Sequence, residues 1–205
     1  MLKIWGRTNS VNVKKALWCA EELGLKYERI DAGMQFGVVN TPEYRRMNPN
    51  GLVPAIEDDG FVLWESHAIV RYLAAKHGAG TLWPSDPRAR ADADRWMDWA
   101  MTPWASIRPV FWGLLRTPPD KRDMQAIEAS RAKAAEQLAI LDAALAGKQY
   151  VAGQAFTMGD VPIGCHVQLW MRLPIARPSQ PNLEAWFERL RARPAYRKIV
   201  DIPLS

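Results

Sequence analysis

The sequence has few residues of the kinds that crosslink small proteins or bind metals. It holds only two cysteines, Cys19 and Cys165, which lie far apart and form no C-x-x-C motif. Disulfide frameworks, zinc knuckles and dithiol redox centres therefore lose support, and both cysteines are expected to be buried as small hydrophobic side chains. The three histidines, His67, His77 and His166, are isolated as well, so no spacing supports a metal site.

Long apolar runs are missing from the start of the chain. Lys3, Gly6 and Arg7 interrupt a very short apolar stretch there, so we expect neither a signal peptide nor a membrane span, and we place the protein in the cytoplasm. The 205 residues include 48% hydrophobic and 24% charged ones, which is typical of globular proteins and far from the disordered class. This length permits one large domain or two small ones.

Positive charge is in small excess, and the net charge of the chain is +5. Concentrated basic patches neutralise nucleic-acid phosphates, but here the basic residues are scattered. The densest run lies at helical spacing among apolar residues and is more simply a solvated helix face. It consists of Arg189, Arg191, Arg193, Arg197 and Lys198. We expect no nucleic-acid partner and keep that role only as an alternative.

Strand and helix patterns alternate at the start of the chain. Residues 2–4 alternate between apolar and polar side chains, which predicts a short strand. Apolar residues then recur with a helical period up to Gly24, a residue suited to end a helix. A second strand is expected over residues 27–30 and a short helix over residues 42–47. A strand, a helix and a strand in this order imply a parallel strand pair.

A hairpin and a third helix complete this first unit. Two β-prone runs, residues 52–57 and 61–65, are joined by Asp58-Asp59-Gly60, whose Asp-Gly pair is a strong hairpin signal. Ser66 can then cap a helix that ends near Gly78. The order βαβ(α)ββα is thus complete by about residue 78.

Residues 79–88 concentrate glycine and proline, as an interdomain linker does. We therefore predict one domain over residues 1–78 and another over residues 89–205. No strand pattern reappears after the linker. Pro103 and Pro109 are expected to kink the first helix of the second domain. The segments expected to be helical are residues 89–116, 120–146, 182–193 and 195–200, with a further helix start, of capping-box layout, at residues 157–160.

The segment NPNGLVPAIEDDGFVLWESHAIVRYLA, residues 48–74, resembles the cytosolic glutathione transferase superfamily, as do the elements before it and the helix start at residues 156–160. The resemblance covers essentially the whole chain, and the loop of residues 8–12 is most similar to the theta-like, serine-type bacterial branch. It implies an α/β thioredoxin-like domain of order βαβαββα followed by an all-helical domain. It also implies glutathione as cosubstrate and a homodimer, while the isolated histidines and cysteines lead us to expect no metal.

In this family the dipeptide Val53-Pro54 is expected to bind glutathione. Most X-Pro bonds are trans, but the resemblance implies a cis bond that turns the Val53 backbone outward to pair with the cysteinyl backbone of the tripeptide. The alternative is a mere edge-strand proline. Leu52 and Asn50 belong to the same predicted binding segment. Many relatives have a lysine or polar residue at Leu52 for the glycyl carboxylate, and here Arg7, Gln35, Asn50 or another basic residue has to replace it.

Glu65 and Ser66 form the other predicted part of the glutathione site. A serine at a helix start ordinarily caps the helix. Free amides and a hydroxyl at that position also form an anion site, which suits the γ-glutamyl carboxylate, while Glu65 can take the ammonium group or a water beside it. The two interpretations of Ser66 are compatible.

The resemblance places the thiol-activating group in the loop after the first strand. Aligning Gly24 with the glycine that ends the first helix in theta-like members makes Ser10 the catalytic serine, with Asn12 in a supporting or competing role. A slip of one residue would favour Thr8 or Asn9 instead. The alternative is that Ser10 or Asn12 simply caps the helix.

A second-substrate pocket is expected where the tryptophan-rich helix faces this loop. Trp104, Ile107, Arg108 and Phe111 share one predicted helix face. Aromatic residues at this spacing also occur in ordinary cores, but an apolar, aromatic wall suits hydrophobic electrophiles. The expected activity is therefore conjugation of the glutathione thiolate to hydrophobic electrophiles, as in detoxification. The alternatives are a glutathione-dependent isomerase or reductase on the same scaffold, or a non-catalytic interaction or regulatory protein.

Overall fold

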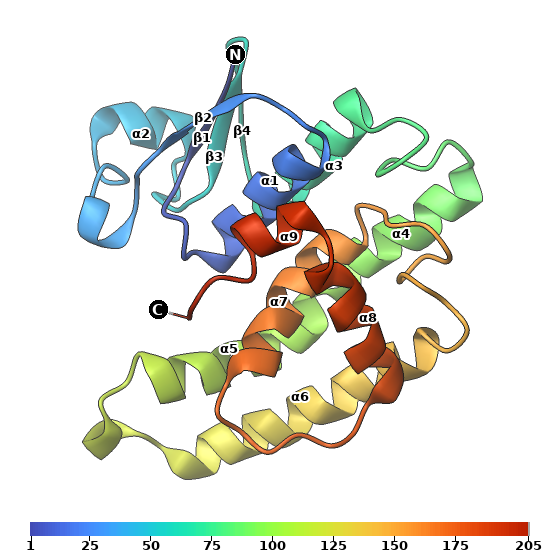
Figure 1. Ribbon diagram of the computed structural model, residues 1–205. Helices are drawn as coiled ribbons and strands as arrows, with labels where there is room; N and C mark the ends of the chain where they lie inside the picture. Colours follow the sequence, from blue (N-terminus) through green and yellow to red (C-terminus); the bar gives the residue numbers. More distant parts are fainter. Residues whose placement is uncertain (205) are drawn as a thin grey trace.

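The computed structural model describes residues 1–204, in which a small mixed sheet with its helices packs against a bundle of helices (Figure 1). The strands of the first domain are β1 (Leu2–Trp5), β2 (Tyr27–Ile30), β3 (Ala55–Asp58) and β4 (Phe61–Trp64). Its helices are α1 (Val11–Glu22), the 3-10 turn η1 (Met34–Phe36), α2 (Pro42–Met47) and α3 (Ser66–His77). The strand order is β2-β1-β3-β4, with β1 parallel to β2 and antiparallel to β3. This is the arrangement of a thioredoxin-like domain.

The predicted alternation and hairpin are both present in the sheet. Leu2 and Ile4 of β1 are buried and the residues that follow each of them are partly exposed, because successive strand residues point to opposite faces. Between β3 and β4, Asp59 and Gly60 have φ angles of 49° and 86°. Two consecutive positive φ angles favour the tight turn that matches the twist of an antiparallel pair.

The second domain is helical throughout. Its helices are α4 (Pro87–Trp99), α5 (Met101–Leu115), the 3-10 turn η2 (Pro119–Lys121), α6 (Met124–Ala144), α7 (Asp160–Arg172), α8 (Pro181–Arg191) and α9 (Pro194–Ile199). The single helix predicted over residues 89–116 is in fact two, which meet at Ala100. Pro103 lies in the first turn of α5, where a missing N–H costs little, and Pro109 lies inside that helix.

Helix α6 begins later than predicted. The side chain of Asp123 accepts a hydrogen bond of 2.9 Å from the backbone N–H of Ala126, and this cap sets the first helical residue at Met124. The residues before it form the short turn η2 instead of a first helical turn. Caps therefore decide this boundary more than apolar periodicity does.

Helix α7 is the centre of the molecule, in contact with α1 of the first domain and with α4, α5 and α8 (Figure 1). Its first residue, Asp160, is fully buried. The Asp160 carboxylate accepts hydrogen bonds from the backbone N–H of Thr157 and Val151, both 3.0 Å, and from Nε1 of Trp186 at 2.9 Å. Burial raises the pKa of Asp160 to about 6, against the effect of these hydrogen bonds. One carboxylate thus joins the start of α7, the loop before it and α8.

The two cysteines are buried free thiols, as expected. Burial raises the pKa of both Cys19 and Cys165, so neither is a reactive thiolate at neutral pH. Among residues 1–204, no group of three or more potential ligand side chains could hold a metal ion. In the same part of the chain, no helix has the length and apolar character needed to cross a bilayer.

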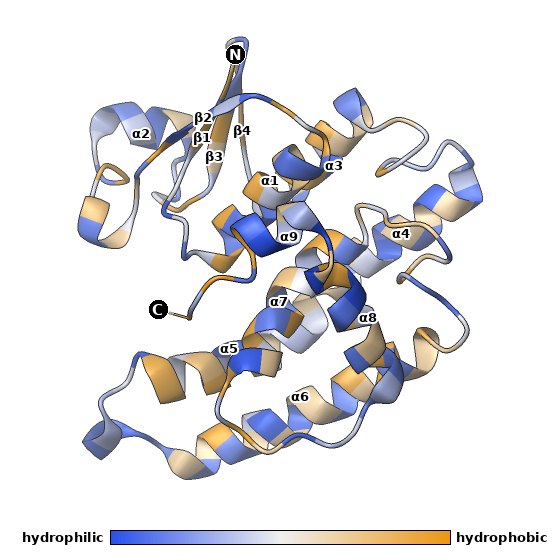
Figure 2. Ribbon diagram, viewed as in Figure 1, coloured by the Kyte–Doolittle hydropathy of each residue, from blue (hydrophilic) through white to orange (hydrophobic). Residues whose placement is uncertain are grey.

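The basic run lies on α8, α9 and the turn between them, where Figure 2 shows strongly hydrophilic residues along the ribbon. Three of its cations pair with carboxylates. Arg191 pairs with Asp201 at 3.0 Å, Arg193 with Glu22 at 2.6 Å, and Lys198 with Glu21 at 2.7 Å. The last two pairs join α9 and the residue before it to α1 of the first domain. The run is a paired, solvated face.

Candidate functional site

A cavity of about 330 Å³ lies between the two domains. Its first-domain wall includes Ser10 and Asn12 at the start of α1 and Val53 before β3, and its second-domain wall includes residues of α5 and α7. The N-terminus of a helix presents backbone N–H groups and a partial positive charge. The cavity is therefore suited to a ligand with a negatively charged atom at this point.

Ser10 precedes the first residue of α1 and is placed to face the cavity. Its backbone is extended, with φ −78° and ψ 124°, and its carbonyl accepts the first helical hydrogen bond from the backbone N–H of Lys14 at 2.9 Å. The Ser10 side chain makes no capping hydrogen bond. The hydroxyl at this position is thus not consumed by the helix.

Asn12 belongs to a partly buried polar cluster that the sequence did not reveal. The ammonium of Lys15 donates a hydrogen bond of 3.0 Å to Oδ1 of Asn12 and lies 3.0 Å from Nε2 of His67. Burial lowers the pKa of Lys15 to about 8, partly opposed by the charge of Glu65. Burial, Lys15 and Arg71 together lower the pKa of His67 to about 3. At neutral pH His67 is therefore uncharged and its Nε2 accepts from Lys15.

A smaller cavity of about 50 Å³ adjoins the first. The residues that line it are Asn12, Asn48, Asn50, Leu52, Val53, Pro54, Glu65 and Ser66. This set contains all six residues predicted to bind glutathione. Asn12, Leu52 and Val53 line both cavities, so the predicted binding segment and the loop of Ser10 border one continuous surface.

The loop before β3 is fixed by hydrogen bonds to its backbone. The hydroxyl of Tyr44 and Nδ2 of Asn48 both donate to the carbonyl of Leu52, at 2.7 and 2.8 Å. The Leu52 side chain itself is 65% exposed. The following Val53–Pro54 peptide bond is cis, as the resemblance implies. The backbone of Val53 is thereby presented by a well-supported loop.

Glu65 is in an unusual backbone conformation. Its φ is 72° and its ψ is 111°, in the region that favours glycine. Non-glycine residues in such conformations are found where the surrounding structure enforces them, often at ligand sites. The next residue, Ser66, is buried and begins α3. The side chain of Glu65 makes no capping hydrogen bond, so its carboxylate is not used by the helix.

Three of the four residues predicted for the second-substrate pocket line the larger cavity. Trp104, Arg108 and Phe111 follow one another along one face of α5, and the ring of Trp104 stacks on His166 with centroids 4.7 Å apart. Ile107 is the exception. Its side chain is fully buried in the hydrophobic core and lines neither of these cavities, because a turn of 100° per residue carries it past the edge of that face.

Several cavity residues were not predicted from the sequence. Lys14, Arg116 and Gln168 line it, as does Arg7, which was named only as one possible anchor for the glycyl carboxylate. Gln168 lies on α7 and Arg116 at the end of α5, so only the tertiary structure brings them to the loop after β1. Lys14 had a local signal, since it lies four residues after Ser10 on the first helix.

Comparisons with known proteins agree along the whole chain. The protein-family model of the glutathione S-transferase N-terminal domain matches residues 1–75, and the family model of the C-terminal domain matches residues 103–194. Glutathione S-transferase GstB of Escherichia coli K12 is 45% identical over 208 residues that cover 100% of both chains. Glutathione S-transferase 3 of Zea mays is 34% identical over 99% of this chain and 95% of that protein.

A solved structure is similar over the same extent. It is the theta class glutathione S-transferase of Xanthomonas axonopodis pv. citri with glutathione bound, at 50% identity and a TM-score of 0.96. The alignment covers 100% of this chain and 99% of that one.

Proposed function

Since the chain belongs to the glutathione S-transferase family, has that family's fold and is a glutathione S-transferase with glutathione as cosubstrate, we propose that Ser10 activates the glutathione thiol for attack on an electrophile. The observation that carries this proposal is the arrangement of the two cavities. All six predicted glutathione-binding residues line the smaller one, and it adjoins the larger one at the start of α1. Nothing in the comparisons favours an isomerase, a reductase or a non-catalytic protein.

The glutathione molecule extends in this proposal along the smaller cavity. The backbone of Val53 pairs with the cysteinyl residue as an added strand would. The γ-glutamyl carboxylate lies at the N-terminus of α3 beside Ser66, where backbone N–H groups and the helix dipole favour an anion. Glu65 takes the γ-glutamyl ammonium. Asn50 and Leu52, with Pro54 behind them, border the remainder of the tripeptide.

The hydroxyl of Ser10 donates a hydrogen bond to the sulfur and stabilises its ionised form. A free thiol of pKa about 8.5 is only about 3% ionised at pH 7, and lowering that pKa by about two units requires about 2.7 kcal/mol. A hydrogen bond to a charged group contributes roughly 1.5 to 3 kcal/mol, and the positive end of α1 adds up to about 1. Serine and helix terminus together are sufficient without a general base.

Asn12 supplies a second donor in this scheme. Lysine has only donors, so the 3.0 Å contact with Lys15 assigns the acceptor oxygen of the Asn12 amide to that side. The Nδ2 group of Asn12 is then available to the cavity. Lys15 acts as a positioning residue, because it fixes which end of the amide is offered to the ligand.

The thiolate attacks an electrophilic carbon, a C–S bond forms, and the leaving group departs with its bonding electrons or, in an addition, the electrons move to a conjugated acceptor. Trp104, Arg108 and Phe111 form the wall against which this electrophile lies. Ile107 is not part of that wall in this proposal, because its side chain is buried in the core.

We also propose the division into residues 1–78, a linker of residues 79–88 and residues 89–205, and a homodimer as the working assembly. The exposed Phe61 and Met101, with 48% and 51% of their surface accessible, are the apolar side chains we expect such a contact to cover. Light scattering on the purified protein measures its mass in solution. A monomer at micromolar concentration would contradict the dimer.

A cytoplasmic location and a role in detoxification follow as further proposals. Free, buried Cys19 and Cys165 suit a reducing compartment. Cell fractionation and the sensitivity of a deletion strain to electrophiles test the two points.

The direct kinetic test of the catalytic proposal is Ser10→Ala. We expect kcat to fall by about 10-fold to 100-fold, since one charge-assisted hydrogen bond is lost, with little change in the Kd of glutathione. Equal turnover in the variant would exclude Ser10 and favour Asn12 or Thr8.

A further inference from the structure

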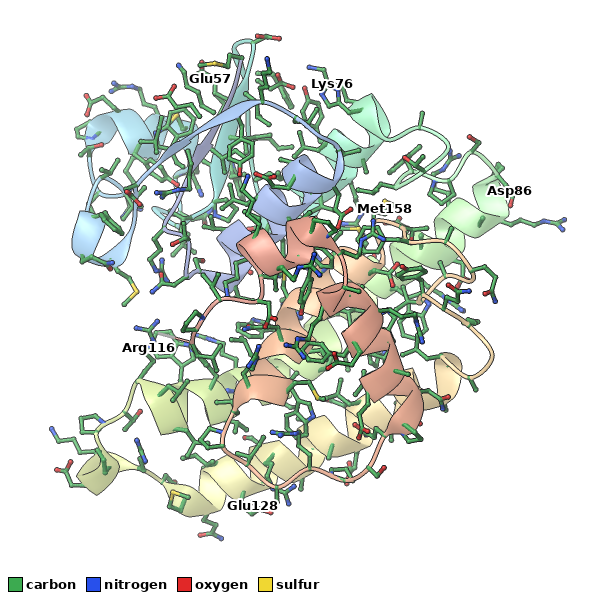
Figure 3. All side chains as sticks on the ribbon, viewed as in Figure 1. Glu57, Lys76, Asp86, Arg116, Glu128 and Met158 are labelled. Atoms are coloured by element: carbon green, nitrogen blue, oxygen red, sulfur yellow. The ribbon has the colours of Figure 1, made fainter. Side chains whose placement is uncertain are left out.

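Lys14 is withdrawn from solvent at the wall of the larger cavity. Only 3% of the residue is exposed, although it lies near the start of α1 and lysines on helices ordinarily reach water. Among residues 1–204, no acidic side chain lines this cavity. Arg116, labelled in Figure 3, marks the side of the cavity at the end of α5. Burying an ammonium costs free energy unless an opposite charge compensates it.

The hydrogen-bond partner of the Lys14 ammonium is neutral. Nζ donates to the carbonyl oxygen of Val200, the residue after α9, at 3.1 Å. This is the only hydrogen bond of that ammonium within the described part of the chain. An ammonium has three N–H donors, so one carbonyl leaves two donors unused and the charge uncompensated.

The charged and titratable groups around Lys14 do not neutralise it. The carboxylate of Asp201 acts on it, but this carboxylate already pairs with Arg172 at 2.5 Å and with Arg191 at 3.0 Å. Cys165 of α7 is a buried thiol whose pKa is raised to about 12, so it is uncharged at neutral pH. Burial lowers the pKa of Lys14, and the smaller effects of Cys165 and Asp201 oppose this only in part. A bound anion would supply the missing charge.

Lys14 lies one helical turn beyond Ser10. Its backbone N–H donates to the carbonyl of Ser10 at 2.9 Å, at the start of α1. Residues four apart share one helix face, and a helical side chain leans toward the N-terminus. The side chains of Ser10 and Lys14 therefore border the larger cavity from the same face of α1. The next residue, Lys15, has partners of its own in Asn12 and His67.

The proposed glutathione site brings an anion to this face. The γ-glutamyl carboxylate is assigned to the start of α3, which leaves the sulfur at the start of α1. Enclosing a thiolate in a cavity disfavours its charged form. A positive charge roughly 6 to 10 Å away offsets this, since at an effective dielectric constant of about 20 it lowers a pKa by about one to two units.

We propose that the buried ammonium of Lys14 stabilises the glutathione thiolate through its charge, together with the Ser10 hydroxyl and the start of α1. The inference rests on the proposed function, because it concerns the same sulfur. Lys14 keeps its proton in this scheme. The proton of the thiol passes to solvent when the sulfur ionises.

The test uses two ligands that differ only at sulfur, because glutathione has an ionisable thiol and S-methylglutathione does not. Lys14→Gln removes the charge and keeps an N–H donor for the carbonyl of Val200. Ultraviolet absorbance gives the thiol pKa of bound glutathione, which we expect to rise by about one unit. Calorimetry at pH 7.5 should show a Kd about 5-fold higher for glutathione, since less thiolate is bound, and a change below about 2-fold for S-methylglutathione.

Three further variants separate charge from structure. Lys14→Met removes both the charge and the donor, and it should raise the thiol pKa as Lys14→Gln does. Lys14→Arg keeps the charge, so most of the low thiol pKa should remain. The matched control is Lys133→Gln on α6, which removes a cation that pairs with Glu136 at 3.3 Å and lines neither cavity of the site. It should leave the thiol pKa unchanged.

Two results would overturn the proposal. One is an unchanged thiol pKa in Lys14→Gln. The other is an equal loss of affinity for the two ligands, because that result marks a structural role in holding the backbone at Val200. If neither neutral variant binds S-methylglutathione, Lys14→Arg decides, since a low thiol pKa there supports the proposal and one raised by about one unit contradicts it. If the unmodified enzyme binds glutathione without forming thiolate, the proposed function itself is wrong.

Discussion

The Lys15 ammonium lies 3.0 Å from Nε2 of His67, a contact that joins α1 to α3 beneath the proposed glutathione site. Lys15 has only donors, so His67 is the acceptor and must be neutral. The same ammonium donates to Asn12, two residues after Ser10, while His67 follows Ser66 directly. The two ends of the proposed glutathione site, at the starts of α1 and α3, are therefore joined by one partly buried polar contact.

The first prediction concerns His67 and acid stability. Its pKa is lowered from 6.5 to about 3 in the folded protein, so between these values only the unfolded chain binds the proton. The stability contributed by neutral His67 is present above pH 6.5 and is lost as the pH falls, by at most about 1.4 kcal/mol per pH unit. Urea unfolding at pH 7, 5.5 and 4.5 should show a smaller loss in His67→Gln. Parallel pH profiles for the two proteins would refute the neutral His67.

The second prediction concerns Lys15 and alkaline pH. Because burial lowers its pKa from 10.5 to about 8, the unfolded chain holds more protons between these values, and this group makes stability rise with pH in that window. Lys15→Met should lack this rise. It should also lower kcat by several-fold, because Asn12 is no longer fixed, with a smaller effect on the KM of glutathione. Unfolding free energies at pH 7.5 and 10 and a kinetic comparison at pH 7 test both parts.

The third prediction separates folding from binding. In the unmodified protein, several N–H groups donate to the buried carboxylate of Asp160. Asp160→Asn replaces one of the two acceptor oxygens by an N–H₂ group, which is itself a donor. We therefore expect the free energy of unfolding to fall by about 2 to 4 kcal/mol. The KM of glutathione should not change where the variant is folded, since Asp160 lines neither of the two cavities of the site. The measurement is thermal unfolding of Asp160→Asn and, for comparison, of Thr157→Val, which we expect to be destabilised less. A stable Asp160→Asn protein would show that these hydrogen bonds are dispensable.

The fourth prediction concerns Ser66. Its removal should weaken glutathione binding by about 10-fold, since a hydrogen bond to a carboxylate is lost, and should change kcat little. Titration calorimetry of Ser66→Ala gives the Kd. Because Ser66 begins α3, the circular dichroism spectrum of the variant should be recorded as well, to check that its helix content is unchanged. Unchanged affinity would remove Ser66 from the glutathione site.

Much of the fold was predictable because its signals are local. The Asp59-Gly60 pair specifies a hairpin turn through its own backbone preferences, and the apolar period of α1 specifies a buried helix face. The break at Ala100 was missed, because Pro103 is acceptable both as a kink and in a first turn.

The site was predictable only in part. The glutathione-binding residues follow one another near two short motifs, so the resemblance located them. Lys15 could not be identified because a lysine on an amphipathic helix ordinarily faces solvent, whereas here tertiary packing buries it against His67. Ile107 was predicted to line the pocket, but it lies in the core. Sequence alone could not decide this, because the residues of one helix face can be assigned to a cavity or to the core only when the elements packed against that face are known. Arg7 and Arg116 border the same cavity only because the two domains meet there.

The central claim is that the start of α1, with the Ser10 hydroxyl, ionises the sulfur of bound glutathione. The most direct test is the ultraviolet absorbance of the thiolate, followed as a function of pH with glutathione bound and without an electrophile. In the unmodified enzyme we predict that the thiol pKa of bound glutathione lies about two units below that of free glutathione. In Ser10→Ala we predict that the thiol pKa of bound glutathione is at least about one unit higher than in the unmodified enzyme. The same low pKa in both proteins would contradict the claim.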